Sequence, residues 1–228
     1  MAQRHGKKYN SVKSKVEAKV YEIEEAISFL KSNPVAKFDE SVDLAARLDV
    51  DPTKTDQAVR GIVRLPHGSG KEVRVVAFAR GAAIEAAKKA GADQAGFEDL
   101  IEKVKGGWTD FDVAVATPEA MQEVKKLGKV LGPRGLMPNP KTGTVNEDIA
   151  AAVEQCKAGR VEFRMDRHGN VHVPVGKLSF DAVKLTENAK AVIEGIKAER
   201  PPAAKGVFVK KWTMSSTMGV GLRIMVRE

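Results

Sequence analysis

Cysteine is almost absent from this chain of 228 residues, in which Cys156 stands alone. A single cysteine excludes a disulfide within the chain, and this composition fits a reducing cytosol. Apolar residues nowhere run for the ~20 positions that a membrane-spanning helix needs, so we expect no membrane partner. The basic start of the sequence is not followed by a hydrophobic stretch, and we therefore expect no secretory signal.

Aromatic and metal-ligating residues are also scarce. Aromatic residues make up 5% of the chain, so stacking of bases on an aromatic sheet is not expected to dominate any nucleic-acid contact. Two of the four histidines, His168 and His172, lie four positions apart, but a predicted turn separates them. No carboxylate stands at ligand spacing beside them, which argues against a metal site.

Signatures of an enzyme are missing as well. No glycine-rich dinucleotide fingerprint follows a predicted strand, and no Ser/His/Asp or Cys/His set has local support. The stretch Gly68–Lys71 is similar to a phosphate-binding loop, but Leu65 replaces its first glycine and Glu72 its Ser/Thr. We therefore expect no catalytic residue, no metal and no cofactor. The alternative that stays open is a nucleotide-dependent or RNA-modifying enzyme.

What the chain does contain is a three-part pattern of hydrophobic residues. Towards both ends, apolar residues recur at helical or alternating spacing, as in amphipathic helices and half-buried strands. In the middle, nearly continuous apolar runs alternate with helices, as in a buried parallel sheet with right-handed crossovers. The predicted helices are 16–31, 82–90, 97–105, 118–127, 147–158 and 180–198, and the predicted strands are 38–48, 59–65, 73–79, 92–95, 111–116, 160–165, 171–175, 205–213 and 220–226.

Turn and capping residues refine this pattern. Strands 38–48 and 59–65 could pair antiparallel, and the turn at 168–170 predicts a hairpin between the strands on either side of it. Thr117 and Asn146 are expected to cap the helices that follow them.

The fold class predicted from this pattern is mixed α/β and α+β, in two domains. A discontinuous α+β domain with an antiparallel sheet is built from both termini, residues 1–67 and 160–228. An α/β, Rossmann-like domain is inserted between them, residues 68–159. Three independent domains would leave terminal pieces of only about seventy residues, which are marginal alone. The two crossings of the chain, near 66–68 and 159–160, would then form a hinge.

Charge is divided in the same way as the hydrophobic pattern. The chain holds 38 Lys and Arg against 30 Asp and Glu, a formal net charge of +8. Residues 68–159 hold 13 of each sign, whereas the terminal segments hold 25 basic and 17 acidic residues and so carry the entire surplus. A protein that is merely soluble and basic is not expected to segregate its charge, so the sequence indicates a nucleic-acid site on the terminal domain.

Folded RNA is favoured over DNA as the partner. No helix-turn-helix with a basic recognition helix, zinc-finger spacing or heptad zipper is present. The first 15 residues include Arg4, His5, Lys7 and Lys8 and contain no acid, which is typical of a flexible basic arm that binds nucleic acid, though often such an arm is only a solvated terminus. Ser215–Gly219 places three hydroxyls beside a glycine, which suits contacts to phosphate and 2′-hydroxyl groups but equally suits a plain hairpin turn.

The most unusual stretch is Gly128–Gly143, which reads GKVLGPRGLMPNPKTG. Its four glycines and three prolines oppose a continuous helix, and its cations Lys129, Arg134 and Lys141 stand without an acid. Two interpretations stay open, a secondary RNA contact or a loop that closes the inserted domain against the other. The second is favoured slightly because the inserted domain is neutral.

This loop, read as LGPRGLMPNPKTGTV, closely resembles the signature of the large-subunit ribosomal protein L-one family. Three further stretches fit the resemblance in order, namely AKFDESVDL, VRGIVRLPHGSGK and SSTMG. The resemblance covers the chain from His5 to about Arg223. It implies the same discontinuous two-domain layout, with the terminal domain on ribosomal RNA and the inserted domain projecting from it.

The resemblance also implies site residues. Thr217, Met218 and Gly219 match the family motif that meets ribosomal RNA, and Lys37, Phe38 and Ser41 match a second RNA-contacting patch. His172 and Arg164 match positions near the RNA surface. Phe38 taken alone would more often be a core residue.

The function implied by the resemblance is that of a non-enzymatic protein of the mobile side stalk of the large ribosomal subunit, located in the cytoplasm. Its expected partners are large-subunit ribosomal RNA, exit-site transfer RNA whose release it assists, and its own messenger RNA whose translation it represses. We expect a monomer when the protein is free. Nothing in the spacing of the residues shows these activities.

Overall fold

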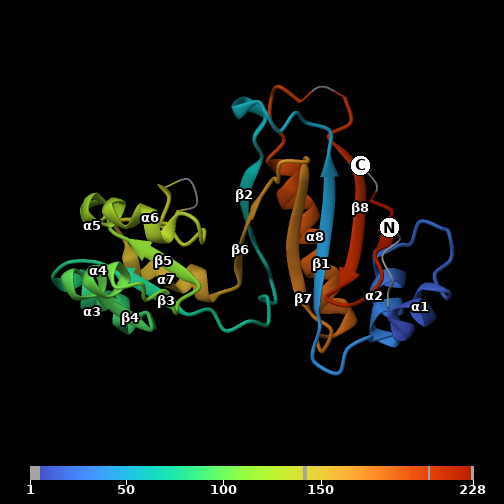
Figure 1. Ribbon diagram of the computed structural model, residues 1–228, viewed down its shortest axis with the longest axis horizontal. Coiled ribbons are helices and arrows are strands. Elements are labelled where there is room, and N and C mark those ends of the chain that lie inside the picture. The colour runs from blue at the N-terminus through green and yellow to red at the C-terminus, as the bar shows by residue number, and fades with distance from the viewer. Residues whose placement is uncertain (1–5, 141–142, 205, 227–228) are drawn as a thin grey trace. The chain divides into compact units, whose positions relative to one another are not determined.

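The computed structural model describes residues 6–140, 143–204 and 206–226 of the chain (Figure 1). The chain divides into two compact units, one of Met1–Gly70 with Val161–Glu228 and one of Lys71–Arg160. We call them the terminal unit and the inserted unit. Helices and sheets occur in both, which confirms the mixed α/β and α+β class. The domain limits 1–67, 68–159 and 160–228 stay a prediction.

The terminal unit is organised around a four-stranded antiparallel sheet of order β7-β1-β8-β9. In the central strand β1, every second side chain is buried, as the alternating sequence pattern predicts. Leu44 of β1 lies opposite Val173 of β7 and Met214 of β8, so the buried positions of three strands share one face. The strands are β1 (Ser41–Leu48), β7 (Asn170–Lys177), β8 (Val209–Ser216) and β9 (Leu222–Ile224).

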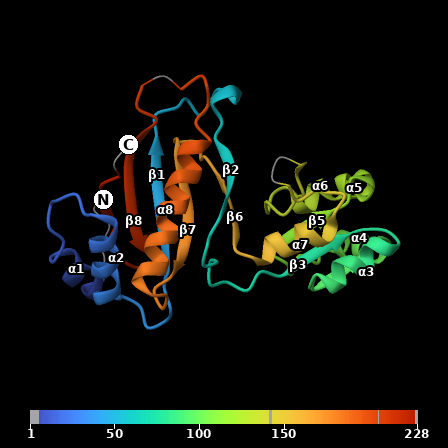
Figure 2. The ribbon, with the colours of Figure 1, turned by 180° about the vertical axis from the view of Figure 1, so that it is seen from behind.

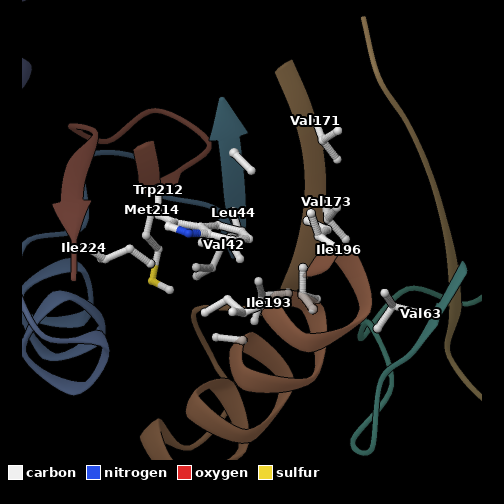
Figure 3. Packing of buried hydrophobic residues seen from close by; sticks show 14 of the residues in the cluster. Val42, Leu44, Val63, Val171, Val173, Ile193, Ile196, Trp212, Met214 and Ile224 are labelled. Atoms are coloured by element: carbon white, nitrogen blue, oxygen red, sulfur yellow. The ribbon is translucent and has the colours of Figure 1, made fainter. Parts of the chain in front are cut away.

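Two helices, α2 (Ile23–Ser32) and α8 (Ala182–Ala198), supply the apolar side chains that pack against this face of the sheet. Figure 2 shows α8 crossing in front of β1 and β7. In Figure 3, Ile193 and Ile196 of α8 lie beneath Leu44, Trp212 and the other sheet residues of the cluster. The opposite face of the sheet carries polar side chains such as His172 and Thr213.

The predicted pairing of strands is wrong in two places. β2 (Arg60–Arg64) does not pair with β1, and β6 (Arg160–Arg164) does not form a hairpin ladder with β7; instead β2 and β6 pair with each other. Both belong to a ribbon that packs on α8, where Val63 lies so close to Gly195 that a β-carbon there would overlap it. Alternation in the sequence identifies strands but not their partners.

The start of the chain also differs from expectation. The helix predicted at 16–31 begins only at Ile23, because Tyr21 is held at the edge of the sheet. The Tyr21 amide donates to the Arg223 carbonyl, and the Met225 amide donates to the Tyr21 carbonyl, both at 2.8 Å. The flexible arm is a wrong prediction for Lys7–Lys13, which forms helix α1. Arg4 and His5 lie outside the described residues.

The inserted unit has a parallel three-stranded sheet of order β4-β3-β5, in which β3 and β5 are buried on both faces, as their continuous apolar runs predict. Val76 and Phe78 face one apolar cluster and Val75 and Ala77 face the other, so helices lie in a layer on each side. The elements are β3 (Val75–Phe78), β4 (Gln94–Gly96), β5 (Val113–Ala116), α3 (Ala82–Lys89), α4 (Glu98–Lys105), α5 (Pro118–Val124), η2 (Lys125–Leu127), α6 (Gly128–Leu131) and α7 (Ile149–Lys157), while η1 (Thr55–Gln57) belongs to the terminal unit.

Capping in the inserted unit agrees with the sequence at one helix and differs at another. Thr117 caps α5 by accepting a hydrogen bond from the Ala120 amide at 3.3 Å, as predicted. The cap of α7 is Asp148 rather than Asn146, because the Asp148 carboxylate accepts from the amides of Ala150 and Ala151, each at 3.1 Å. An aspartate adds a favourable charge at the positive end of the helix dipole.

The glycine- and proline-rich loop is partly helical, contrary to expectation. Its first residues form α6, which continues the helical path of α5 and η2. Leu131 is fully buried, and Leu136 and Met137 pack on the same cluster, so the loop is part of the inserted unit's core. Every helix in the described part of the chain is too short or too polar to cross a membrane.

Candidate nucleic-acid interface

The two patches that the resemblance picked out lie side by side in the terminal unit. One is the turn after β8 that contains Thr217, and the other is the segment that leads into β1 at Ser41. The Thr217 amide donates to the Ser41 carbonyl at 3.0 Å, and the Ser41 amide donates to the Thr217 hydroxyl at 2.9 Å. Residues 176 positions apart in the sequence therefore form one surface.

Two large apolar side chains on this surface face solvent. Phe38 is 59% exposed and Met218 is 54% exposed. Lys37, next to Phe38, is also exposed. Such side chains are usually buried, and neighbouring exposed ones beside a cation mark a contact surface for another molecule. We call Lys37, Phe38, Ser41 and 217–219 the two-loop surface.

Beneath the two-loop surface lies a fully buried carboxylate, Glu40. One of its oxygens accepts from the amides of Val35 at 3.0 Å and Ala36 at 2.7 Å, and the other accepts from the Met218 amide at 3.1 Å. Burial by itself raises the pKa of Glu40, but hydrogen bonds from the Ser216 side chain and these amides outweigh it and hold the pKa below its ordinary value. Sequence reasoning missed Glu40, although it lies inside the AKFDESVDL stretch.

Gly219 has a steric reason to be glycine. Its amide donates to the Ser216 carbonyl at 3.0 Å, which closes the turn. A β-carbon at this position would overlap the Ser216 hydroxyl, the group that bonds Glu40. The absence of a side chain therefore keeps the turn and the buried network together.

Helix α1 brings part of the basic N-terminal segment to the same place. A hollow of about 360 Å³ is lined by Gly6, Lys8, Tyr9 and Val35 on one side and by 217–219 on the other. Lys8 therefore borders the two-loop surface, and Lys7 is exposed on the same helix. Predicted site residues from three separate stretches thus gather at one end of the sheet.

The open face of the sheet extends away from this end. His172 lies opposite Ala45, four residues along β1 from Ser41, or about 13 Å at the rise of a strand. Between them, burial raises the pKa of Asp43 above its ordinary value, although the charges of His172 and Lys177 oppose the shift. Lys177 donates to the Ser41 hydroxyl at 2.8 Å. Arg164 is exposed on β6, in the other sheet, and is not part of this cluster.

The loop cations predicted as a secondary contact lie in the inserted unit. Lys129 is on α6, and the Arg134 guanidinium donates to the Thr109 hydroxyl. Lys141 lies outside the described residues. Leu131, Leu136 and Met137 tie the described part of this loop to the apolar cluster of the inserted unit, and its RNA contact stays a prediction.

A larger hollow of about 830 Å³ lies elsewhere in the terminal unit and contains none of the predicted residues. It is lined by apolar residues of 206–209 and 224–226 together with Lys197, Arg200, Lys210, Lys211 and Arg223. Its basic side chains match the positive charge of the unit, but its position next to β9 could not be read from the sequence.

The groups that an enzyme would need do not come together in the described residues. Gly68–Lys71 is an irregular segment without a following helix, and Lys71 pairs with Asp112 at 2.6 Å. The Asn188 side chain accepts from the His67 amide and donates to the Gly68 carbonyl, which gives this segment a structural role. Over residues 6–140, 143–204 and 206–226, no group of three His, Cys, Asp or Glu side chains could hold a metal ion.

Known proteins resemble this chain over almost its whole length. The profile of the Ribosomal protein L1p/L10e family matches residues 30–220. The relative from Protochlamydia amoebophila, named large ribosomal subunit protein uL1, is 54% identical over 211 residues, which are 92% of this chain and 89% of that protein. Proteins of the same name from Thermosipho melanesiensis and Methylobacillus flagellatus are 52% and 53% identical over 97% and 96% of this chain, and over 96% and 95% of their own lengths. By these matches the chain belongs to the ribosomal protein L1p/L10e family.

Proposed function

We propose that this protein is a non-enzymatic constituent of the large ribosomal subunit in the cytoplasm, and that its terminal unit binds large-subunit ribosomal RNA at the mobile side stalk. The observation that carries the proposal is the two-loop surface, on which Phe38 and Met218 are exposed beside Lys37 and the backbone of a hydroxyl-rich turn. Apolar side chains can pack on bases or sugars there, while amides and hydroxyls bond phosphates and 2′-hydroxyl groups.

The distribution of charge supports the same unit as the RNA-binding one. The terminal unit holds 24 Lys and Arg against 17 Asp and Glu, whereas the inserted unit holds 14 against 13. A polyanion is attracted to the first and is indifferent to the second. RNA binding should therefore weaken steeply with added salt, because phosphate contacts release counterions.

Two finer activities belong to the proposal through family membership. The inserted unit assists the release of deacylated transfer RNA from the exit site, and the terminal unit represses translation of its own messenger RNA when that RNA imitates the ribosomal site. In the second activity, one RNA-binding surface would bind either ribosomal RNA or messenger RNA. The free protein is a monomer.

The test replaces Met218 with alanine and measures affinity for deproteinised bacterial large-subunit ribosomal RNA. We expect a loss of about 1–3 kcal/mol with unchanged thermal stability, because the side chain is exposed in the free protein and its packing is gained only with RNA. Thr217→Val should also weaken RNA binding, but by another route, because it removes the hydroxyl that ties the turn to Ser41 in the free protein.

The matched control is Met225→Ala, because Met225 is 50% exposed on the same unit and lies outside the two-loop surface. Its RNA affinity should equal that of the wild type. Equal losses in the two methionine variants, or no loss in either, would remove this surface from the RNA site. Phosphate contacts weaken strongly over a salt range on the order of 50 to 200 mM. A wild-type RNA affinity that stays constant over that range would contradict binding through charge.

A further inference from the structure

A single buried charge connects the two halves of the two-loop surface. The Glu40 side chain is fully buried and accepts hydrogen bonds from the Val35 and Ala36 amides on one side. On the other side it accepts from the Met218 amide and the Ser216 side chain. The first two donors precede Lys37 and Phe38 directly, and the other two belong to the turn of Thr217.

We propose that Glu40 is a positioning residue for RNA binding, whose carboxylate holds the Lys37–Phe38 segment against the 216–219 turn before RNA arrives. This inference rests on the proposed function, and it explains how the free protein keeps the two loops of the RNA-binding surface together. Ordering two loops at the moment of binding costs affinity, and a surface assembled beforehand avoids that cost.

The chemistry of the site explains why the residue is a carboxylate. Four donors point at Glu40, and an ionised carboxylate is an acceptor only, with about four lone pairs to offer. A glutamine in the same place would turn its amide NH₂ group towards at least one of these donors. The exchange of one oxygen for nitrogen should therefore break one side of the network without changing the size of the side chain.

The position of the charge argues for a functional role beyond a stabilising one. A buried charge is weak support for stability, since desolvation opposes the bonds that it makes. A negative charge directly under a surface that binds a polyanion is also unfavourable at long range. Glu40 is buried despite its desolvation and despite its repulsion of a polyanion, at a position where its hydrogen bonds align two exposed contact segments.

Neighbouring contacts offer a matched control. Asp39 accepts from the Ser179 amide at 3.1 Å and from the Ser179 hydroxyl at 2.8 Å, and it is exposed. Asp39→Asn removes one negative charge next to Glu40 but leaves the four donors and their acceptor in place. Comparison of Asp39→Asn with Glu40→Gln therefore separates the effect of charge from the effect of the network.

The experiment measures three quantities on the full chain of the wild type, Glu40→Gln and Asp39→Asn. They are the Kd for deproteinised bacterial large-subunit ribosomal RNA, its dependence on salt, and amide hydrogen exchange of the free protein. For Glu40→Gln we expect a loss of affinity of about ten-fold or more. The salt dependence should be unchanged, because every cation remains. Exchange at Val35, Ala36 and Met218 should accelerate in the free protein and slow again when RNA is bound.

Asp39→Asn should keep the wild-type exchange pattern and bind RNA within about two-fold of the wild type. The proposal is overturned if Glu40→Gln binds as Asp39→Asn does, or if the three amides exchange at wild-type rates. If exchange accelerates equally at core amides such as Val173, the residue is merely structural and the proposal also fails.

Ser216→Ala covers the case in which Glu40→Gln does not fold, since it removes one of the four donors and leaves the charge. It should weaken binding by about three-fold or more and accelerate exchange at Met218. Wild-type affinity with wild-type exchange in this variant overturns the proposal. Failure of the wild-type protein to bind the RNA would instead refute the proposed function, and the exchange data would still decide whether Glu40 holds the two loops together.

Discussion

The two units of this protein solve the burial of a β-sheet in different ways. The parallel sheet of the inserted unit has an apolar cluster on each face, so its strands β3 and β5 are almost fully covered. The antiparallel sheet of the terminal unit packs its apolar side chains against α2 and α8 and leaves its polar face and the two-loop surface exposed. The unit with an open sheet also carries nearly all of the net positive charge, because its 24 Lys and Arg outnumber 17 Asp and Glu, whereas the inserted unit holds 14 against 13. The difference teaches that topology and net charge single out the same unit, which is the one proposed to bind RNA.

The largest expected effect is the loss of unfolding free energy when a buried leucine is replaced in the core of either unit. Leu44 of the terminal unit and Leu131 of the inserted unit are both fully buried, and leucine to alanine at either should cost about 2–5 kcal/mol of unfolding free energy. Leu44→Ala should also weaken RNA binding, because β1 carries Ser41. Leu131→Ala should leave RNA affinity unchanged under conditions where the terminal unit stays folded.

Thermal unfolding followed by circular dichroism, together with filter binding of RNA, checks this prediction. If Leu131→Ala weakened RNA binding as much as Leu44→Ala, the division of labour between the units would be wrong.

The next effect in size concerns glycine. Gly219→Ala should reduce RNA affinity by about ten-fold, because the new β-carbon displaces the Ser216 hydroxyl from Glu40. The control is Gly128→Ala in the inserted unit, where a β-carbon would make only an ordinary contact with the Met137 sulfur at 3.7 Å. That variant should bind RNA normally, and a loss of affinity in it would show that the loop of the inserted unit takes part.

Single charges should distinguish the units more finely. Lys37→Ala should lower the salt slope of RNA binding by about 0.7–0.9, the value for one phosphate contact. Lys129→Ala, the same change on the inserted unit, should leave the slope unchanged. Titration of the complex with salt at constant pH measures the slope for each variant. Equal slopes in the two variants would show that Lys129 also contacts phosphate.

The smallest effect is expected at Asp43 on the open sheet face. Burial raises the pKa of Asp43, so the folded protein holds this proton more tightly than the unfolded chain does. The stabilising contribution is complete below the ordinary value of 3.8 and is lost as pH rises through the folded pKa. Asp43→Asn should therefore gain stability relative to the wild type as pH rises, by under about 1 kcal/mol at neutral pH.

Urea unfolding of the Asp43→Asn variant at pH 3 and pH 7 measures this change. The variant should also bind RNA slightly more tightly, because a negative charge leaves the surface. A variant that is less stable than the wild type at pH 7 would contradict the prediction.

Residue patterns predicted the elements of this fold better than their partners. The alternation in 38–48 and the continuous runs at 73–79 and 111–116 identified β1, β3 and β5, because burial on one face or two leaves a direct trace in the sequence. The pairing of β2 with β6 left no such trace, since the alternation in each strand fits any neighbouring strand equally well. The predicted helix 16–31 begins late for the same kind of reason, because Tyr21 makes tertiary backbone hydrogen bonds with Arg223 and Met225.

The exposed residues of the candidate site could be named from the sequence, whereas the buried residue beneath them could not. Thr217, Met218 and Lys37 stand out through motif and exposure, whereas Glu40 reads as one more charge in an acidic stretch. Its role depends on donors from residues 35–36 and 216–218, which only the folded chain brings together. One signal was available, since Glu40 directly precedes the alternating strand that starts at Ser41.

The central place of β1 in its sheet has a consequence for synthesis. This strand ends at Leu48, but both of its neighbours, β7 and β8, come after residue 169. Domains fold as units during translation. The inserted unit is therefore synthesised completely before the strands that pair with β1 have been made. The proposed RNA-binding surface is assembled only after residues 217–219 have been added, so a chain terminated before them would contain a folded inserted unit without that surface.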